Sequence, residues 1–282
     1  MTRLSELPIG EALSVLIYGK SGVGKTFFGG SIGNRGIFFD LGNGHSTLTS
    51  STFKQKNPTS NPIVEIIHET TTNRGLVLKP TGFDSLCDKL DDYFDTKSAD
   101  FDSIVIDDFT SLTQLALNKA LDLNKSSGKS LTLATAQTSR AIPLTAVQDY
   151  GTLIDILKFF LGTYITRAKA TGKHFIILAH ERTIYKPGKI GEDAKLNKVF
   201  PHAPGKDNFA PSVLPAFFDE VYHLEMKGNT RTFRTQPNEI YLAKTRHSGE
   251  LNQFEDNLNF TNWLAKIRGV NSEVKPIIQL EK

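Results

Sequence analysis

A glycine-rich stretch near the start of the chain combines a lysine and a hydroxyl at a fixed spacing. The residues from Gly19 to Thr26 read Gly-Lys-Ser-Gly-Val-Gly-Lys-Thr, which fits the pattern G-x-x-x-x-G-K-[ST]. Glycines let the backbone curl so that its N–H groups face phosphate oxygens, and a following helix adds its positive N-terminal end. Lys25 would then reach the β- and γ-phosphates of a nucleotide, and the Thr26 hydroxyl would bind Mg²⁺. The predicted nucleotide-binding residues are Gly19, Lys20, Ser21, Gly22, Val23, Gly24, Lys25, Thr26 and Phe27, together with Asp40 farther along the chain.

Acidic residues follow two apolar runs and are candidates to complete this site. The run Ser-Ile-Val-Ile ends on Asp107, at the carboxyl end of a predicted parallel strand, where ligand crevices form. We expect Asp107 to hold the metal with Thr26, with capping of the next helix as the alternative. Asp108 is expected to orient or deprotonate the attacking water, and helix capping is an equal alternative. Asp40 ends another predicted strand, where it faces the γ-phosphate or caps a turn.

A third apolar run, from His174 to Ala179, is followed by His180 and Glu181. At the same rim His180 would contact the γ-phosphate, and a structural role is its alternative. Glu181 is a further candidate to act on water. The seven histidines show no metal-ligand spacing, so no zinc site is expected, and the lone Cys87 excludes an intramolecular disulfide.

The elements that must position these residues alternate along the chain. Apolar runs predict strands at 14–18, 36–40, 63–67, 103–107 and 174–180, and later at 219–226, 231–235 and 239–244. Helices are predicted after Lys25 and at 83–94, 110–124, 153–164 (ending by Gly172) and 261–267, and loops at 42–61 and 182–214. This order indicates an α/β fold with a mostly parallel twisted sheet, helices on both faces and antiparallel strands toward the C-terminal end.

Five stretches together resemble the RecA-like P-loop ATPases, and more closely the phage-encoded, core-only Sak-type single-strand annealing proteins. They are Leu-Ile-Tyr-Gly-Lys-Ser-Gly-Val-Gly-Lys-Thr (16–26), Phe-Phe-Asp-Leu-Gly-Asn-Gly (38–44), Ile-Val-Ile-Asp-Asp-Phe-Thr-Ser-Leu (104–112), Ile-Ile-Leu-Ala-His-Glu (176–181) and Tyr-Leu-Ala-Lys-Thr-Arg (241–246). The resemblance implies a RecA-like core that binds ATP between the subunits of a homo-oligomer, either a ring or a filament. Lys244 and Arg246 match the basic residues that reach a neighbour's γ-phosphate in that family.

The resemblance also implies that loops at about 125–147 and 182–214 line a channel for single-stranded DNA. Both segments are basic, with a net charge of +3 in each of 119–140 and 182–209. The DNA-contacting candidates are Lys125, Lys129, Arg140, Lys186, Lys189, Lys195 and Lys198. Tyr185, Phe200 and Phe209 would stack on bases, or pack within the loop instead. A single-strand-binding protein is a further candidate partner.

One position departs from the RecA pattern. Relatives usually carry a water-activating glutamate after the second strand, and the corresponding residue here is Gly42. Asp40, Asp108 or Glu181 would have to substitute, or hydrolysis would be slow. The identity of the catalytic base therefore stays open at the level of the sequence.

Composition sets wider limits. The chain has 282 residues and a net charge of +3, and an acidic stretch at 82–108 with a net charge of −7 masks the two basic segments. No apolar run approaches the roughly 20 residues that span a bilayer, so we expect a cytoplasmic protein without membrane contact, in the host cytoplasm if phage-encoded. Residues 1–270 are expected to form a single core, followed by a tail at 271–282.

The leading hypothesis is an ATP-hydrolysing protein that promotes annealing or strand exchange on single-stranded DNA in phage-type recombination. Three alternatives stay open: a ring-forming helicase-like motor, a nucleotide-gated DNA-binding module with negligible turnover, and a P-loop kinase acting on a small metabolite. The kinase would need an Arg-rich lid, and the 182–214 segment holds only Arg182. No N-K-x-D guanine-binding sequence appears, which favours ATP over GTP.

Overall fold

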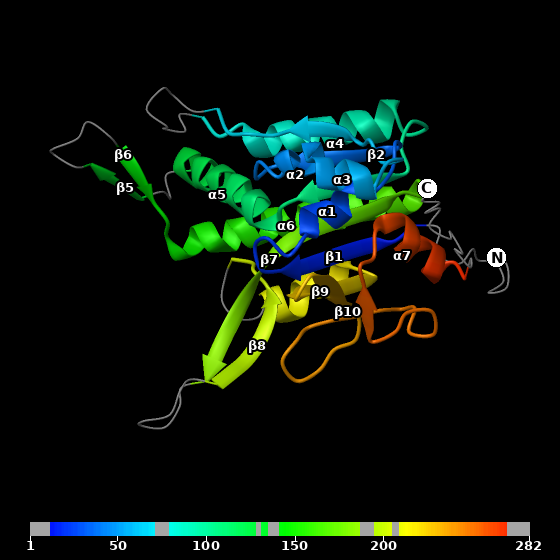
Figure 1. Cartoon of the computed structure of the whole chain (residues 1–282). Coiled ribbons are helices and arrows are strands. Elements are labelled where there is room, and N and C mark those ends of the chain that lie inside the picture. The colour runs from blue at the N-terminus through cyan, green and yellow to red at the C-terminus, as the bar shows by residue number, and fades with distance from the viewer. Residues whose placement is uncertain are drawn as a thin grey trace, which may run out of the picture.

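The computed structural model describes residues 12–70, 79–127, 131–134, 141–186, 195–204 and 209–269, with the backbone alone for 131–134 and 141–144 (Figure 1). The strands are β1 (Ser14–Gly19), β2 (Gly36–Asp40), β3 (Ile63–Ile66), β4 (Ser103–Asp107), β5 (Leu131–Ala134), β6 (Ala141–Leu144), β7 (His174–Lys186), β8 (Lys195–Pro201), β9 (Glu220–Lys227), β10 (Thr230–Arg234) and β11 (Phe254–Asp256). The helices are α1 (Lys25–Gly30), α2 (His45–Thr49), α3 (Ser51–Lys56), α4 (Gly82–Thr96), α5 (Phe109–Ser126), α6 (Val147–Ala170) and α7 (Phe260–Ile267), with a π-helical turn η2 (Phe209–Val213) and a 3₁₀ turn η3 (Leu214–Phe217).

The larger sheet is mostly parallel. Its strand order is β11-β10-β9-β1-β7-β4-β2-β3, with β8 paired to β7 outside this path. The pairs from β9 to β3 are parallel, whereas β10 runs antiparallel to β9 and β11. Because neighbouring parallel strands point the same way, their carboxyl ends meet at one edge, where Gly19 lies opposite His180 and Asp40 opposite Asp107. The predicted fold class is confirmed.

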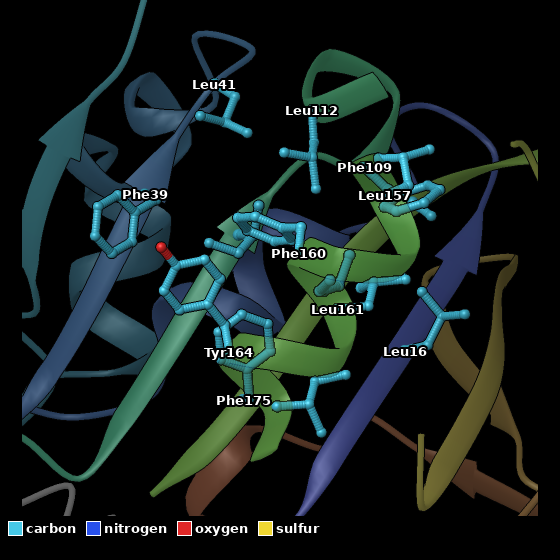
Figure 2. Close-up of a cluster of buried hydrophobic side chains, with 14 of the residues drawn as sticks. Leu16, Phe39, Leu41, Phe109, Leu112, Leu157, Phe160, Leu161, Tyr164 and Phe175 are labelled. Atoms are coloured by element: carbon cyan, nitrogen blue, oxygen red, sulfur yellow. The ribbon is translucent and has the colours of Figure 1, made fainter. Parts of the chain in front are cut away.

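Helices cover both faces of this sheet. One apolar cluster joins Leu16 and Tyr18 of β1 to side chains of α4, α5 and α6, and a second joins Val15 and Ile17 to α1, α3 and α7. Side chains alternate across a strand, so β1 contributes to both clusters. Figure 2 shows the first cluster, in which Phe160 and Leu161 of α6 lie over the sheet. Strands buried on both faces are apolar throughout, which is why β1, β2 and β4 were visible in the sequence.

In the residues that the structure describes, each of the two expected loops contains a pair of antiparallel strands, called hairpins below. Within 125–147 the strands β5 and β6 pair antiparallel, and within 182–214 the long β7 continues to Lys186 and pairs antiparallel with β8. Both hairpins project beyond the sheet on the same side of the molecule (Figure 1). The loop prediction failed because β7 changes from a continuous apolar strand to a mixed polar one after Ala179, and the sequence pattern changes with it.

Two other predictions need correction. The expected loop at 42–61 contains the short helices α2 and α3, and the Ser50 hydroxyl caps α3 by accepting the Phe53 N–H at 3.2 Å. The expected strand at 239–244 forms only two isolated bridges, Val199 with Tyr241 and Val221 with Lys244. The edge strand of the antiparallel end is instead β11, whose three residues are too few to show a period.

Within the residues that the structure describes, no helix is both long enough and apolar enough to cross a membrane.

Candidate functional site

The glycine-rich stretch forms the turn between β1 and α1, at the carboxyl edge of the parallel sheet. Gly22 and Gly24 have φ of 79° and 100°, a left-handed backbone that side chains with a Cβ rarely adopt. The turn borders a cavity of about 410 Å³. Its lining residues are Ser21, Gly22, Gly24, Lys25, Thr26, Phe27, Gly42, Gly44, Thr47, Asp107, Asp108, His180 and Arg231.

Most of the predicted nucleotide-binding residues thus lie at one cavity, but four do not line it. Gly19 packs so closely that a Cβ there would lie 2.2 Å from the Leu224 carbonyl oxygen. Val23 is buried in the apolar cluster beneath the turn, and Lys20 is exposed. Asp40, the fourth, is held elsewhere, as described below.

Lys25 lies at the floor of the turn. Its ammonium donates to the carbonyl oxygens of Gly19 at 2.9 Å and Lys20 at 2.8 Å. Burial lowers the pKa of Lys25, and the nearby carboxylates of Asp107 and Asp108 oppose that shift. The ammonium is therefore a buried cation held by carbonyl dipoles, in a position to exchange these contacts for phosphate oxygens.

Thr26 and Asp107 meet as the sequence predicted. The Thr26 hydroxyl donates to Oδ2 of Asp107 at 2.6 Å, and the Asp107 side chain is almost fully buried. Burial, opposed by the Thr26 hydrogen bond and aided by the neighbouring carboxylates of Asp108 and Asp40, raises the pKa of Asp107 to about 6. A bound cation would stabilise the ionised form of this buried carboxylate, which lies near two other negative charges.

This pair fits Mg²⁺. Both donors are oxygens, which the ion prefers, and Mg²⁺ is usually held by one or two protein groups together with phosphates and water. Gly44 keeps the space beside the carboxylate open, since a Cβ there would lie 2.6 Å from Oδ2 of Asp107. No cluster of three or more His, Cys, Asp or Glu that could hold a metal by itself occurs in the described ranges, consistent with a site completed by phosphate.

Asp108 lies beside the pair and points toward His180. Its Oδ2 is 3.4 Å from Nε2 of His180, and its Oδ1 accepts the Ser111 N–H at 2.7 Å as the cap of α5. Burial acts to raise the pKa of Asp108, but the hydrogen bonds from His180 and Ser111 outweigh it, so the pKa lies below its usual value. Asp108 is therefore a carboxylate at neutral pH, and it combines the capping role with a place at the cavity.

Gly42 explains how the carboxylate at 108 finds room. A Cβ at Gly42 would lie 3.2 Å from Oδ2 of Asp108 and 3.2 Å from Oγ of Ser111. A side chain at position 42 would therefore point at the place that Asp108 occupies. Asp108 therefore occupies the space toward which a glutamate at position 42, the residue expected from the resemblance to RecA-like ATPases, would point.

Asp40 and Glu181 are committed to other contacts. Asp40 is fully buried and accepts the N–H groups of Gly42 at 3.2 Å, Gly44 at 2.8 Å and His45 at 2.9 Å. This is the turn-capping alternative, and the carboxylate does not face the cavity. Glu181 pairs with the buried His223, Oε2 to Nε2, at 2.9 Å. It is also absent from the cavity lining, so neither acid is placed to activate water in this subunit.

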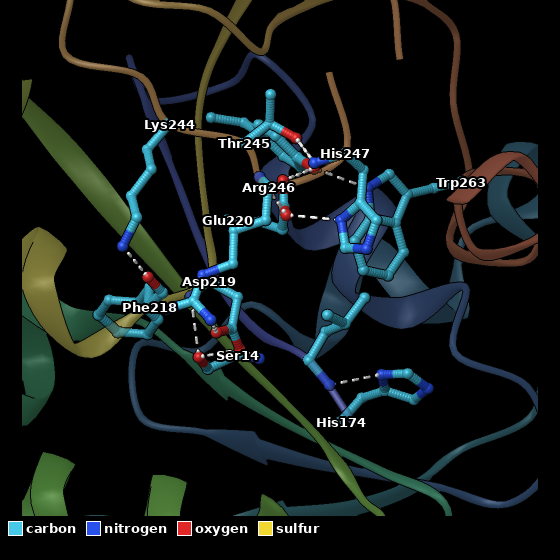
Figure 3. A network of polar contacts seen from close by, with 12 residues as sticks. Ser14, His174, Phe218, Asp219, Glu220, Lys244, Thr245, Arg246, His247 and Trp263 are labelled. Atoms are coloured by element: carbon cyan, nitrogen blue, oxygen red, sulfur yellow. Dashed lines mark hydrogen bonds and ion pairs between the residues drawn. The ribbon is translucent and has the colours of Figure 1, made fainter. Parts of the chain in front are cut away.

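Lys244 and Arg246 lie at the opposite edge of the sheet. Lys244 donates to the carbonyl of Phe218 at 2.5 Å, and Arg246 pairs with Asp219 at 3.1 Å (Figure 3). Asp219 in turn accepts from Ser14 at the amino end of β1, whereas the glycine-rich turn follows the carboxyl end of that strand. Neither basic side chain is placed to reach the nucleotide site of its own subunit.

The described DNA-contacting candidates are exposed. Lys186, Lys195 and Lys198 lie on the β7–β8 hairpin, and Lys125 lies in the last turn of α5 before the β5–β6 hairpin. Lys129, Arg140 and Lys189 lie outside the described residues. Among the aromatic candidates Tyr185 is 58% exposed, whereas Phe200 and Phe209 are buried and follow the packing alternative.

Sequence reasoning missed Arg231, which lines the cavity from β10. The residue lies more than 200 positions after the glycine-rich turn and belongs to no motif, so no spacing in the sequence indicated it.

A family model described as an AAA domain matches residues 11–247, a range that includes the glycine-rich turn, Asp107, Asp108 and His180. The search of curated proteins found no match. The match covers most of the chain, and its nucleotide-binding loop is the one whose geometry is described above. The chain therefore belongs to the AAA domain family and is a P-loop NTPase of the AAA type.

Proposed function

We propose that this protein hydrolyses ATP with Mg²⁺ and uses bound ATP to hold single-stranded DNA for annealing or strand exchange. The observation that carries the ATPase part is the convergence of Lys25, the Thr26–Asp107 pair and the Asp108–His180 pair on one cavity. The DNA part goes beyond the family match and depends on the hairpins and on the resemblance to Sak-type annealing proteins.

The side chains divide the work of phosphoryl transfer. Lys25 would donate to the β- and γ-phosphates, and Thr26 with Asp107 would hold Mg²⁺, which would supply positive charge to the phosphate oxygens. Asp108 accepts the proton of the attacking water, because it is ionised and lies beside the space that Gly42 leaves open. His180 holds the Asp108 carboxylate in place through Nε2, at the rim where it would contact the γ-phosphate.

An oligomer supplies the remaining charge. In one subunit Lys244 and Arg246 lie at the edge of the sheet opposite the nucleotide, so they can contact only the nucleotide of a neighbour. Arg246 is 62% exposed despite its ion pair with Asp219, and it is available to a second subunit. A neighbouring guanidinium at the γ-phosphate would stabilise the charge that develops during transfer.

The hairpins supply the DNA surface. The β7–β8 hairpin carries the exposed Lys186, Lys195, Lys198 and Tyr185, which combine backbone-tracking charge with a stacking ring. It continues the strand that carries His180, and the β5–β6 hairpin projects from the same side (Figure 1). The nucleotide and the DNA would thus be held at one end of the molecule.

The test is to measure ATPase and binding to single-stranded DNA with Mg²⁺, in the presence of ATP or a non-hydrolysable analogue. Lys25→Ala should abolish ATP binding and the ATP-dependent part of DNA binding, while Lys54→Ala on α3 serves as the control. Undiminished ATP-dependent DNA binding by Lys25→Ala would refute the proposal. DNA binding with ATP but no turnover would instead support a nucleotide-gated module.

Strand-unwinding assays and electron microscopy of the complex with DNA separate the proposal from a helicase-like motor. Annealing without unwinding is the expected result. Unwinding by ring-shaped particles would favour the motor.

A further inference from the structure

Arg231 lies against the glycine-rich turn from a distant part of the chain. It is on β10, and its guanidinium carbon is 4.2 Å from the centre of the Phe27 ring. Its Nε lies only 2.2 Å from the position that a Cβ at Gly24 would occupy. The guanidinium therefore lies along the backbone that leads from the turn into α1, at the wall of the nucleotide cavity.

This cation has no anionic partner in the part of the chain that the structure describes. Its Nε is buried without a hydrogen-bond acceptor, and its guanidinium forms no ion pair with a described carboxylate. Arg35, Arg167 and Arg246, by contrast, each pair with an aspartate. Arg234 on the same strand also has a buried Nε without an acceptor, so what distinguishes Arg231 is its place in the cavity lining. Burial lowers the pKa of Arg231 with no compensating carboxylate, yet an arginine stays charged at neutral pH. A desolvated, unpaired charge is costly unless a ligand supplies the missing anion.

The position of Arg231 along the turn indicates which phosphate of a nucleotide would pair with its guanidinium. Lys25 and the Thr26 hydroxyl serve the β- and γ-phosphates and the metal, whereas the backbone of the turn cradles the α- and β-phosphates. Arg231 lies over the ring of Phe27, the residue that follows Thr26 in the chain. The phosphate left without a side-chain cation is the α-phosphate.

We propose that Arg231 is a nucleotide-binding residue whose guanidinium, seated on the Phe27 ring, donates to the α-phosphate of the nucleotide held by its own subunit. This inference rests on the proposed nucleotide-binding function. It assigns Arg231 a role within one subunit, distinct from that of Lys244 and Arg246 toward a neighbour. The planar guanidinium matters as well as its charge, because it packs flat on the ring and presents its N–H edge to the ligand.

The experiment is equilibrium binding of ADP and ATP with Mg²⁺ to the wild type and to Arg231→Gln, which removes the guanidinium and its charge but keeps a polar side chain. Loss of a charged hydrogen bond should raise the Kd for both nucleotides by about 10- to 100-fold, and equally, because both carry the α-phosphate. Arg231→Lys should recover only part of the affinity. Arg234→Ala is the matched control, since Arg234 is on the same strand and stacks on Tyr241 and Phe254, away from the cavity.

The outcomes separate this inference from the proposed function. An unchanged Kd in Arg231→Gln, with wild-type binding that Lys25→Ala abolishes, would overturn the inference and leave the nucleotide site intact. A loss for ATP but not for ADP would also overturn it, because the contact would then be to the γ-phosphate. Absence of nucleotide binding in the wild type would refute the proposed function itself. Thermal melting of each variant confirms that it is folded, and Arg231→Lys repeats the test if Arg231→Gln is not.

Discussion

Replacing Asp108 by asparagine tests the assignment of the catalytic base with little disturbance of the fold. Asp108 caps α5 through the Ser111 N–H at 2.7 Å and faces His180 at 3.4 Å. Asparagine is as good an N-cap as aspartate, so the first contact is retained. The contact with His180 that this change weakens lies partly at the surface, since the His180 side chain is 39% exposed.

Hydrolysis should respond far more strongly than stability. A positioned general base contributes about 10²- to 10⁴-fold to a rate, which corresponds to roughly 3–5 kcal/mol in the activation free energy. Asp108→Asn should therefore lower kcat for ATP by this factor, with the Kd for ATP changed by no more than a few-fold. Asp108→Ala should show the same loss of kcat and a further cost of about 1 kcal/mol in the free energy of unfolding, because it also removes the cap.

The assay is phosphate release under saturating ATP, Mg²⁺ and single-stranded DNA, with ATP binding and thermal melting measured in parallel. Asp108→Asn with a kcat within five-fold of the wild type would refute the assignment. A second variant uses Gly42, because a Cβ added at this position would point toward the Asp108 side chain. Gly42→Glu in the Asp108→Ala background should regain part of the lost rate, since it supplies a carboxylate to the same space.

Three further predictions concern the neighbouring subunit, the DNA surface and acid stability. The Arg246→Ala variant should bind ATP normally but hydrolyse it at least ten-fold more slowly. Mixing Arg246→Ala subunits with Lys25→Ala subunits should restore some ATP turnover. No recovery in such mixtures would argue against action between subunits. Changing Lys186, Lys195 and Lys198 together to Ala should reduce the slope of the logarithm of the DNA-binding constant against the logarithm of the salt concentration by about 2 for single-stranded DNA. The control variant with Lys54→Ala and Lys56→Ala should keep the wild-type slope. Equal slopes for the triple variant and the wild type would exclude the hairpin as a DNA contact. Burial, aided by Arg268 and opposed by Asp102, lowers the pKa of His174 from 6.5 to about 4. The neutral imidazole therefore stabilises the fold fully above pH 6.5. This contribution, at most roughly 3 kcal/mol, is lost as the pH falls from 6.5 toward 4. His174→Gln should flatten the stability curve over this window in urea denaturation, and a curve parallel to the wild type would contradict the assignment.

The parts of the fold that the sequence predicted are those in which local pattern and tertiary environment agree. β1, β2 and β4 are apolar runs buried on both faces, and each is followed by a residue of the site. Their parallel pairing brings the ends together, so the order of the motifs along the chain was enough to place Lys25, Thr26, Asp107, Asp108 and His180 at one edge of the sheet. The chemistry of this site depends on local motifs joined by a simple topology.

The parts that could not be predicted depend on contacts between distant segments. Arg231 reaches the cavity only because β10 folds back beside β9. The residue spacing in the sequence does not indicate which residues of these two antiparallel strands pair. The segment 239–244 contains strand-forming residues, but the Asn238 side chain accepts hydrogen bonds from the N–H groups of Ile240 and Tyr241. These N–H groups are therefore not used in a regular series of hydrogen bonds to a neighbouring strand. Local hydrogen bonds of this kind compete with the sheet and leave no period in the sequence.

One strand explains why ATP and DNA binding are expected to depend on each other. Successive side chains of β7 point to opposite faces, so His180 faces the nucleotide cavity while Glu181 turns to the buried His223. Glu181 and His223 thereby fix the strand at the rim of the sheet, and the same strand continues for five more residues to Lys186. At about 3.3 Å per residue Lys186 lies within roughly 20 Å of His180 along a single extended chain. If His180 contacts the γ-phosphate as proposed, its movement on ATP binding would occur next to the hairpin. The salt dependence of DNA binding should consequently be measured with and without ATP, and the lysine-dependent part of the slope should appear only with ATP bound.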